Sequence, residues 1–304
     1  MEQHKAELPI SDYMRFSELF LVREDALILV AQLNQLLKAV QRHRGISMGM
    51  LAGNTEFKRE FLTLQRQLER RLATLEAFAK ANQLLSARDK ENLSLAWATI
   101  RSNWEGDDLN DNFELHSHFI EQLLVMIASL ARELESPLVD ISQVKLGTGA
   151  FSPERYAQQG DIIKFVCKTL PQTIEQVARI RGTAAYAAAV MSTEGLDERK
   201  LRFWVNSLKE HAAQLASQSE TLRVKLAAVF PSLVLIKKNE SQLLQFLAAV
   251  EATVFSAKGG RDEAHQLFNV ATDVIEVYWD VVADGLAAVQ RWHRADLEAW
   301  VALG

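Results

Sequence analysis

Apolar residues recur at helical spacing along almost the whole chain, and no segment shows sustained alternation of apolar and polar residues. The 304 residues include only 13 glycines and 5 prolines, which favours long helices over many turns. A chain of this length can form one large domain or two ordinary ones. The sequence therefore predicts an all-α protein.

The helical pattern is interrupted most strongly near the middle of the chain, between two halves that each offer about four helices. We therefore expect two tandem up-and-down four-helix bundles. The predicted parts are a first helical bundle over 1–136, a linker over 137–151 and a second helical bundle over 152–304. A single continuous helical array is the alternative. Pro171 should kink or split its helix, and a break in the first helix is possible near Arg23.

Composition and charge exclude several classes of protein. The net charge is −5, and Lys and Arg alternate with Asp and Glu, so the chain lacks the basic surface of a nucleic-acid-binding protein. The one cysteine, Cys167, rules out an intrachain disulfide and argues against a cysteine-based zinc site. The longest apolar run, residues 123–131, is about half of what spans a bilayer. We expect a soluble, cytoplasmic protein with no membrane partner and no direct nucleic-acid partner.

A short motif occurs once in each half. VQRHRG at 40–45 and VARIRG at 177–182 share the pattern V-x-R-x-R-G, and each copy lies late in the first long helical region of its half. Helical spacing places Arg44 and Arg181 on the apolar stripes of their helices. Neither arginine has an acidic residue three or four positions away. Because an unpaired buried charge is very costly, each guanidinium must find an anion or strong acceptors.

Two explanations for these arginines remain open. In the structural one, a carboxylate from another helix pairs with each arginine, and Asp161, Glu121 or Asp273 could serve. In the functional one, a positive cavity receives a small anion. Small residues after each arginine leave room, Ser47 and Thr183 can donate hydrogen bonds, and a guanidinium matches two oxygens of a planar oxyanion. A single small anion could contact both arginines only in a shared cavity, which is our expectation.

The arginine–glycine motif, followed by small residues and a second amphipathic helix, resembles the bacterial nitrate- and nitrite-sensing (NIT) domain family. The resemblance is clearest over 41–51. That family is an all-helical pair of four-helix bundles that binds nitrate or nitrite through arginines, in chemoreceptors, sensor kinases and a transcription antiterminator. The resemblance implies a sensor that signals by conformational change to a regulatory partner protein, in transcription antitermination or other nitrogen regulation.

Carried over by residue, Arg44 matches the family's arginine before glycine, and Arg181 is its counterpart in the second half. The full set of candidate ligand-binding residues is Arg44, Arg181, His43, Ser47, Thr183, Arg42 and Arg179. His43 stands where family members often have an acidic or a second basic residue. A further family arginine in the second half is not located, and the candidates are Arg223, Lys238 and Arg261. No RNA-binding module follows the second half, so we expect that a partner carries the output or that the chain is a fragment of a longer regulator.

The remaining chemistry-bearing residues suggest no reaction. No phosphate-binding loop, nucleophile elbow or pair of catalytic carboxylates is present, so we expect no enzyme activity, no cofactor and no metal. His116 and His118 point about 200° apart on a helix, and we expect His118 in the core and His116 at the surface. Trp300 is a candidate interface residue of a possible homodimer. The alternative function is a helical scaffold or adaptor whose buried arginines are structural, and a metal- or haem-binding bundle ranks below both.

Overall fold

The computed structural model describes residues 10–102, 104–135, 138, 152–193, 197–256 and 258–302, with side chains from Met14 onward. Every regular element in these ranges is helical, which confirms the all-α prediction. The helices are α1 (Ile10–Leu51), α2 (Lys58–Asn82), α3 (Ala87–Arg101), α4 (Leu109–Glu135), α5 (Pro153–Lys164), α6 (Leu170–Val190), α7 (Glu198–Leu226), α8 (Leu233–Thr253) and α9 (Arg261–Val301).

Helix boundaries follow local capping chemistry. The Ser86 side chain accepts from the Asp89 N–H, and the Asp89 carboxylate accepts from the Ser86 N–H, which forms a capping box before α3. The Ser152 side chain accepts from the Arg155 N–H and caps α5, with Pro153 in the first turn, where proline is common. After α1, Gly53 takes a left-handed φ of 84° that favours glycine. The break considered near Arg23 is not found, because α1 is one continuous helix.

Pro171 disturbs its helix as predicted. A π-helical turn, Phe165–Thr169, joins α5 to α6, and in it the Leu170 N–H donates to the Phe165 carbonyl. Proline lacks an N–H and its ring collides with the preceding turn of an α-helix. The wider turn accommodates both effects, so α5 and α6 form one long helix with an irregular middle.

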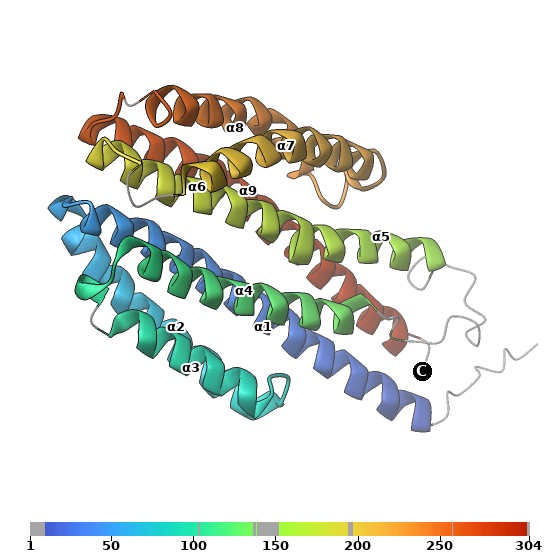
Figure 1. Cartoon of the computed structure of the whole chain (residues 1–304). Coiled ribbons are helices and arrows are strands. Elements are labelled where there is room, and N and C mark those ends of the chain that lie inside the picture. The colour runs from blue at the N-terminus through green and yellow to red at the C-terminus, as the bar shows by residue number, and fades with distance from the viewer. Residues whose placement is uncertain are drawn as a thin grey trace, which may run out of the picture.

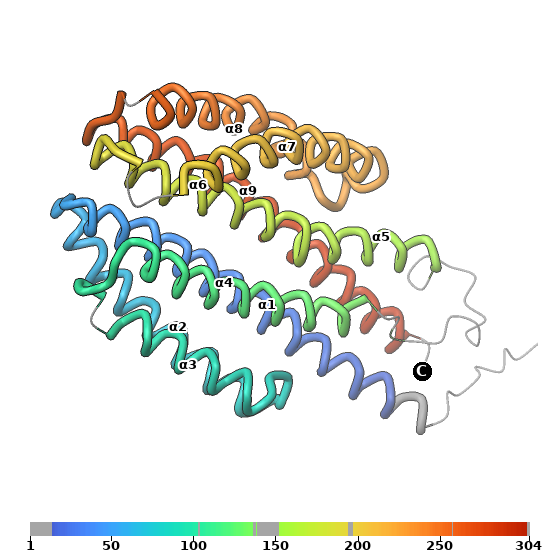
Figure 2. Tube along the Cα trace, viewed as in Figure 1, coloured from blue at the N-terminus to red at the C-terminus, as the bar shows by residue number. Residues whose placement is uncertain are grey.

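Four long helical segments form the centre of the molecule. Helices α1, α4, α5–α6 and α9 pack on one another, the α2–α3 hairpin covers α1 and α4, and the α7–α8 hairpin covers α6 and α9 on the opposite side (Figure 1). Figure 2 shows that α1 and α5–α6 run in the same direction, whereas α4 and α9 run in the other. The predicted linker 137–151 lies outside the described residues, apart from Leu138. In the described part of the chain, no helix is both long enough and apolar enough to cross a membrane.

Candidate functional site

The two copies of the repeated motif meet where α1 crosses α6. A Cβ placed on Gly182 would lie 3.7 Å from the Cα of Gly45 and 3.0 Å from the Sδ of Met48. A Cβ placed on Gly45 would lie 2.9 Å from the ring of Phe268. The glycine that ends each motif therefore allows the close approach of the two helices, and it brings Arg44 and Arg181 to the same crossing.

Arg44 is fully buried and paired with a carboxylate. Its two terminal nitrogens donate to the two carboxylate oxygens of Glu175 in α6, at 2.8 Å and 3.1 Å. One of these nitrogens also donates to Ser117 Oγ at 3.0 Å, and the guanidinium lies 5.1 Å from the ring centroid of Phe113. Arg44 thus has the structural partner considered in the sequence, but that partner is Glu175 and not one of the three carboxylates named there.

Glu175 is itself surrounded by donors. Arg179 Nε donates to it at 2.8 Å, and Gln41 Nε2 donates to it at 2.9 Å. Burial alone would raise the pKa of Glu175, but the pKa is lowered because the charges and hydrogen bonds of Arg44 and Arg179 outweigh burial. We call Gln41, Arg44, Ser117, Glu175 and Arg179 the Glu175 cluster. It is a network of ion pairs and hydrogen bonds, and a terminal nitrogen of Arg179 also pairs with a Glu121 carboxylate oxygen at 2.8 Å.

Arg181 is equally buried but has only neutral partners. Its terminal nitrogens donate to Thr272 Oγ1 at 3.1 Å and to the Gln41 carbonyl at 3.0 Å, and its guanidinium lies 4.7 Å from the ring centroid of Phe268. No carboxylate of the described residues forms an ion pair with it, and its Nε, like that of Arg44, has no partner there. Burial, with the nearby charges of Arg44 and Arg42, lowers the pKa of Arg181 to about 9. We call Arg181, Phe268, Thr272 and the Gln41 carbonyl the Arg181 site.

The surroundings of the two arginines repeat each other. Phe113 and Ser117 of α4 stand four residues apart, as do Phe268 and Thr272 of α9. In both pairs the hydroxyl donates to the carbonyl of the phenylalanine and accepts from the arginine. The stretches FELHSHFIE at 113–121 and FNVATDVIE at 268–276 share F-x-x-x-[ST]-x-x-I-E. This second repeat was present in the sequence, and it was the available signal for these contacts.

One position breaks the repetition. Glu175 stands six residues before Arg181, and Lys38 stands six residues before Arg44. Glu175 reaches across to Arg44, whereas its counterpart Lys38 is a cation and pairs with Glu276 of α9. The repeat position that holds a carboxylate, Glu175, in α6 therefore holds a cation, Lys38, in α1.

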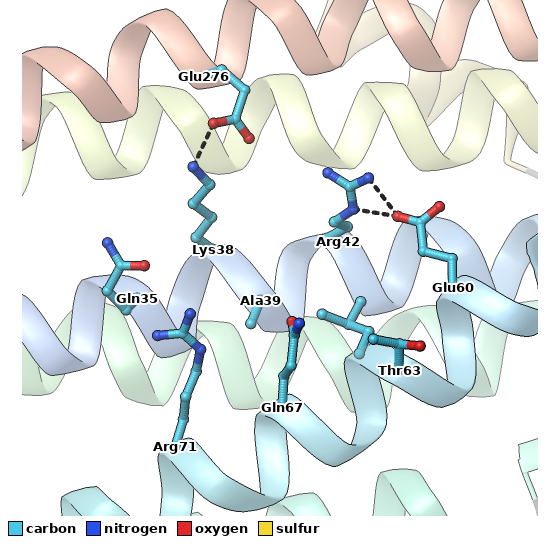
Figure 3. Close-up of a pocket in the computed structure, with 10 residues that line it drawn as sticks. Gln35, Lys38, Ala39, Arg42, Glu60, Thr63, Gln67, Arg71 and Glu276 are labelled. Carbon is cyan, nitrogen blue, oxygen red and sulfur yellow. Dashed lines mark hydrogen bonds and ion pairs between the residues drawn. The ribbon is translucent and has the colours of Figure 1, made fainter.

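A cleft of about 450 Å³ lies between α1, α2 and α9 (Figure 3). Lys38 pairs there with Glu276, and Arg42 pairs with Glu60. Arg181 itself does not line this cleft. Two residues that accept hydrogen bonds from Arg181 are close in sequence to residues that do line it: Gln41 comes one residue before Arg42, and Thr272 comes four residues before Glu276. The cleft is lined by Gln35, Lys38, Ala39, Arg42, Glu60, Thr63, Leu64, Gln67, Arg71 and Glu276.

The three other predicted site residues, His43, Ser47 and Thr183, are also buried. His43 points into the first half, where its Nδ1 lies 2.7 Å from Nε2 of His116. The Ser47 hydroxyl lies 2.9 Å from the Arg44 carbonyl and 2.7 Å from Asn112 Oδ1, and Thr183 is buried in α6. His116 is fully buried and His118 is exposed, so our assignment of these two histidines was reversed. Among the described residues, no group of three or more His, Cys, Asp or Glu side chains could hold a metal ion.

Comparisons of the chain with protein-family models, with curated proteins and with solved structures gave no match. The resemblance noted in the sequence motif therefore gains no support from them. The geometry around Arg44 and Arg181 carries the functional conclusion.

Proposed function

We propose that the protein senses a small planar oxyanion, nitrate or nitrite, which binds at the Arg181 site and is reported to a regulatory partner by a conformational change. One observation carries this proposal: Arg181 is buried at the crossing of α1 and α6 and has no carboxylate partner among the described residues. The protein would act as a binding module and not as an enzyme.

Electrostatics favour an anion at this place. Neutral hydrogen-bond partners and an aromatic face offset only part of the cost of burying a cation. Opposite unit charges about 4 Å apart attract by about 4 kcal/mol at an effective dielectric constant near 20. Burial is the largest cause of the lowered pKa of Arg181. The charges of Arg44 and Arg42 lower this pKa further, and those of Glu175 and Glu276 offset part of the effect. A planar oxyanion also offers two oxygens to one guanidinium.

The same arrangement supplies a route for the signal. Lys38 and Arg42 line the cleft and currently engage Glu276 of α9 and Glu60 of α2. An anion that approaches Arg181 through the cleft competes with these two carboxylates for the cations. Binding then loosens the ties of α1 to α9 and α2, and it favours the conformation in which Arg181 is neutralised. A ligand shifts an equilibrium only through such a difference in affinity.

We also propose a division of the molecule into two bundles. We take the molecule as two tandem up-and-down four-helix bundles, α1–α4 and α5–α9, which meet through α1, α4, α5–α6 and α9. The packing of each outer hairpin on its own half supports this division. An anion at the α1–α6 crossing would then adjust how the two bundles meet. We place this sensor in the cytoplasm, and we leave its assembly as a possible homodimer.

The Arg44–Glu175 pair favours a second candidate, a helical scaffold or adaptor whose buried arginines only join the two halves. In that case Arg181 is held by Thr272, Gln41 and Phe268 alone, and no small ligand binds.

Thermal melts with nitrate, nitrite and chloride at matched ionic strength separate the two candidates. A ligand present at 100 times its dissociation constant stabilises by about 2.7 kcal/mol, a shift of several degrees for domains of this size. We expect nitrate or nitrite to raise the melting temperature of the native chain, and we expect no such rise for Arg181→Met. Equal shifts in melting temperature with nitrate, nitrite and chloride would contradict the sensor proposal and support the scaffold.

A further inference from the structure

The repeated geometry around the two arginines says what kind of ligand the Arg181 site accepts. In the Glu175 cluster, the anion position beside Arg44 is filled by a carboxylate of the chain itself, bound through both oxygens. The donors to that carboxylate come from Arg44, Arg179 and Gln41. This half of the crossing already contains a bound planar anion, tethered to α6.

The other half keeps most of the same parts. Arg181 corresponds to Arg44, and Arg42 corresponds to Arg179, since each stands two residues before its arginine. Phe268 and Thr272 hold Arg181 as Phe113 and Ser117 hold Arg44. Two positions differ: Lys38 takes the place of Glu175 in the repeat, and Ala178 takes the place of the donor Gln41.

We propose that the Arg181 site selects planar anions with two coplanar oxygens, small carboxylates as well as nitrate and nitrite, because its counterpart is built around the Glu175 carboxylate. This inference rests on the proposed function for the location of the site, and it adds the class of ligand. Formate is the smallest carboxylate of this shape. Chloride has no oxygens to offer. Sulfate can present two oxygens to a guanidinium, but its other two oxygens lie outside that plane, so it does not match the flat shape of the Glu175 carboxylate.

The repeat also indicates how to fill the site from within. A glutamate at position 38 would stand on α1 where Glu175 stands on α6, and it could reach Arg181 as Glu175 reaches Arg44. Because Glu276 now pairs with Lys38, its charge must be removed in the same chain. Lys38→Glu with Glu276→Gln should therefore imitate the bound ligand, and Lys38→Gln with Glu276→Gln is the matched control without a carboxylate.

Calorimetric titration of the full chain tests this proposal, first with nitrate and then with nitrate in excess formate, chloride or sulfate. We expect formate to weaken the apparent nitrate affinity at least about tenfold, while chloride and sulfate at matched ionic strength do not. The Lys38→Glu/Glu276→Gln chain should lose nitrate and formate binding. The Lys38→Gln/Glu276→Gln chain, which removes one cation of the cleft but adds no carboxylate, should bind both anions more weakly without losing them.

Nitrate binding that formate leaves unchanged, or that persists in the Lys38→Glu/Glu276→Gln chain, overturns the inference while the proposed function stands. Formate binding that depends on Arg181, without any nitrate or nitrite binding, overturns the proposed function and supports the carboxylate class. Binding of none of the three anions overturns both. The competition experiment uses the native chain, so it remains decisive if a variant fails to fold.

Discussion

At the scale of single residues, two buried arginines in the same sequence motif have opposite electrostatic environments. Arg44 has a bidentate carboxylate partner, whereas Arg181 has a hydroxyl, a carbonyl and an aromatic ring. Removing one member of a buried ion pair typically costs 3–5 kcal/mol, roughly, because the other charge is left unpaired. Removing a buried cation that lacks an anion relieves a cost instead.

Arg44→Met and Arg181→Met should therefore change stability in opposite directions without ligand. We expect Arg44→Met to lower the free energy of unfolding by about 3 kcal/mol, since Glu175 would keep only Arg179 as a cationic partner. Arg181→Met should leave that free energy unchanged or raise it. Urea unfolding in an anion-poor buffer measures both, and a large destabilisation by Arg181→Met would count against an uncompensated charge.

The buried histidine pair makes the first half sensitive to acid. Burial lowers the pKa of His116 to about 3 and that of His43 well below its ordinary value. The Asn112 carbonyl can only accept, so His116 donates to it from Nδ1 and accepts from His43 at Nε2. Between pH 6.5 and about 3 the unfolded chain therefore binds more protons than the folded one, and stability falls as the pH falls.

His116→Gln should remove part of this acid sensitivity. Unfolding free energies at pH 7 and at pH 4.5 should differ by about 2 kcal/mol less in His116→Gln than in the native chain. Carboxylates titrate in both proteins, so their effect cancels in the comparison. Exposed His118 provides the control, and His118→Gln should keep the native pH dependence. If His116→Gln and His118→Gln behave alike, the histidine pair is not the acid-sensitive group.

At the scale of helices, the sequence predicted most of the structure because apolar spacing and capping residues are local signals. The disturbance at Pro171 was predicted, and Ser86 and Ser152 are of the residue type that commonly caps a helix start. The contact of Arg44 with Glu175 was not, because it joins residues 131 positions apart whose proximity depends on the helix crossing. The reversed histidines show the same limit, since the face that a residue presents depends on which helices surround it.

The close packing of α9 on α1 depends on Gly45. A methyl group at Gly45 would lie 2.9 Å from the Phe268 ring, whereas nothing lies within 4 Å of a methyl group at Gly160 in α5. We expect Gly45→Ala to destabilise by about 1–3 kcal/mol through overpacking. Gly160→Ala should stabilise by up to about 1 kcal/mol through helix propensity. Thermal melts of both variants check this contrast, and a stabilising Gly45→Ala would show that Phe268 of α9 does not pack this closely on α1.

At the scale of the whole molecule, two halves with related motifs meet along α1, α4, α5–α6 and α9. The α2–α3 hairpin lies outside α1 and α4, and the α7–α8 hairpin lies outside α6 and α9. The interrupted helical pattern predicted two halves, and only the three-dimensional arrangement shows that the repeated segments meet at the crossing of α1 and α6. The two guanidiniums share one crossing but not one set of partners. The structure therefore favours one anion beside Arg181, with Glu175 in the equivalent place beside Arg44.

The number of nitrate ions bound per chain tests this most directly. Calorimetric titration of the native chain should give one site, Arg181→Met should abolish it, and Arg101→Met, at an exposed ion pair on α3, should preserve it. Two sites per chain, or native affinity in Arg181→Met, would contradict a single anion position at Arg181.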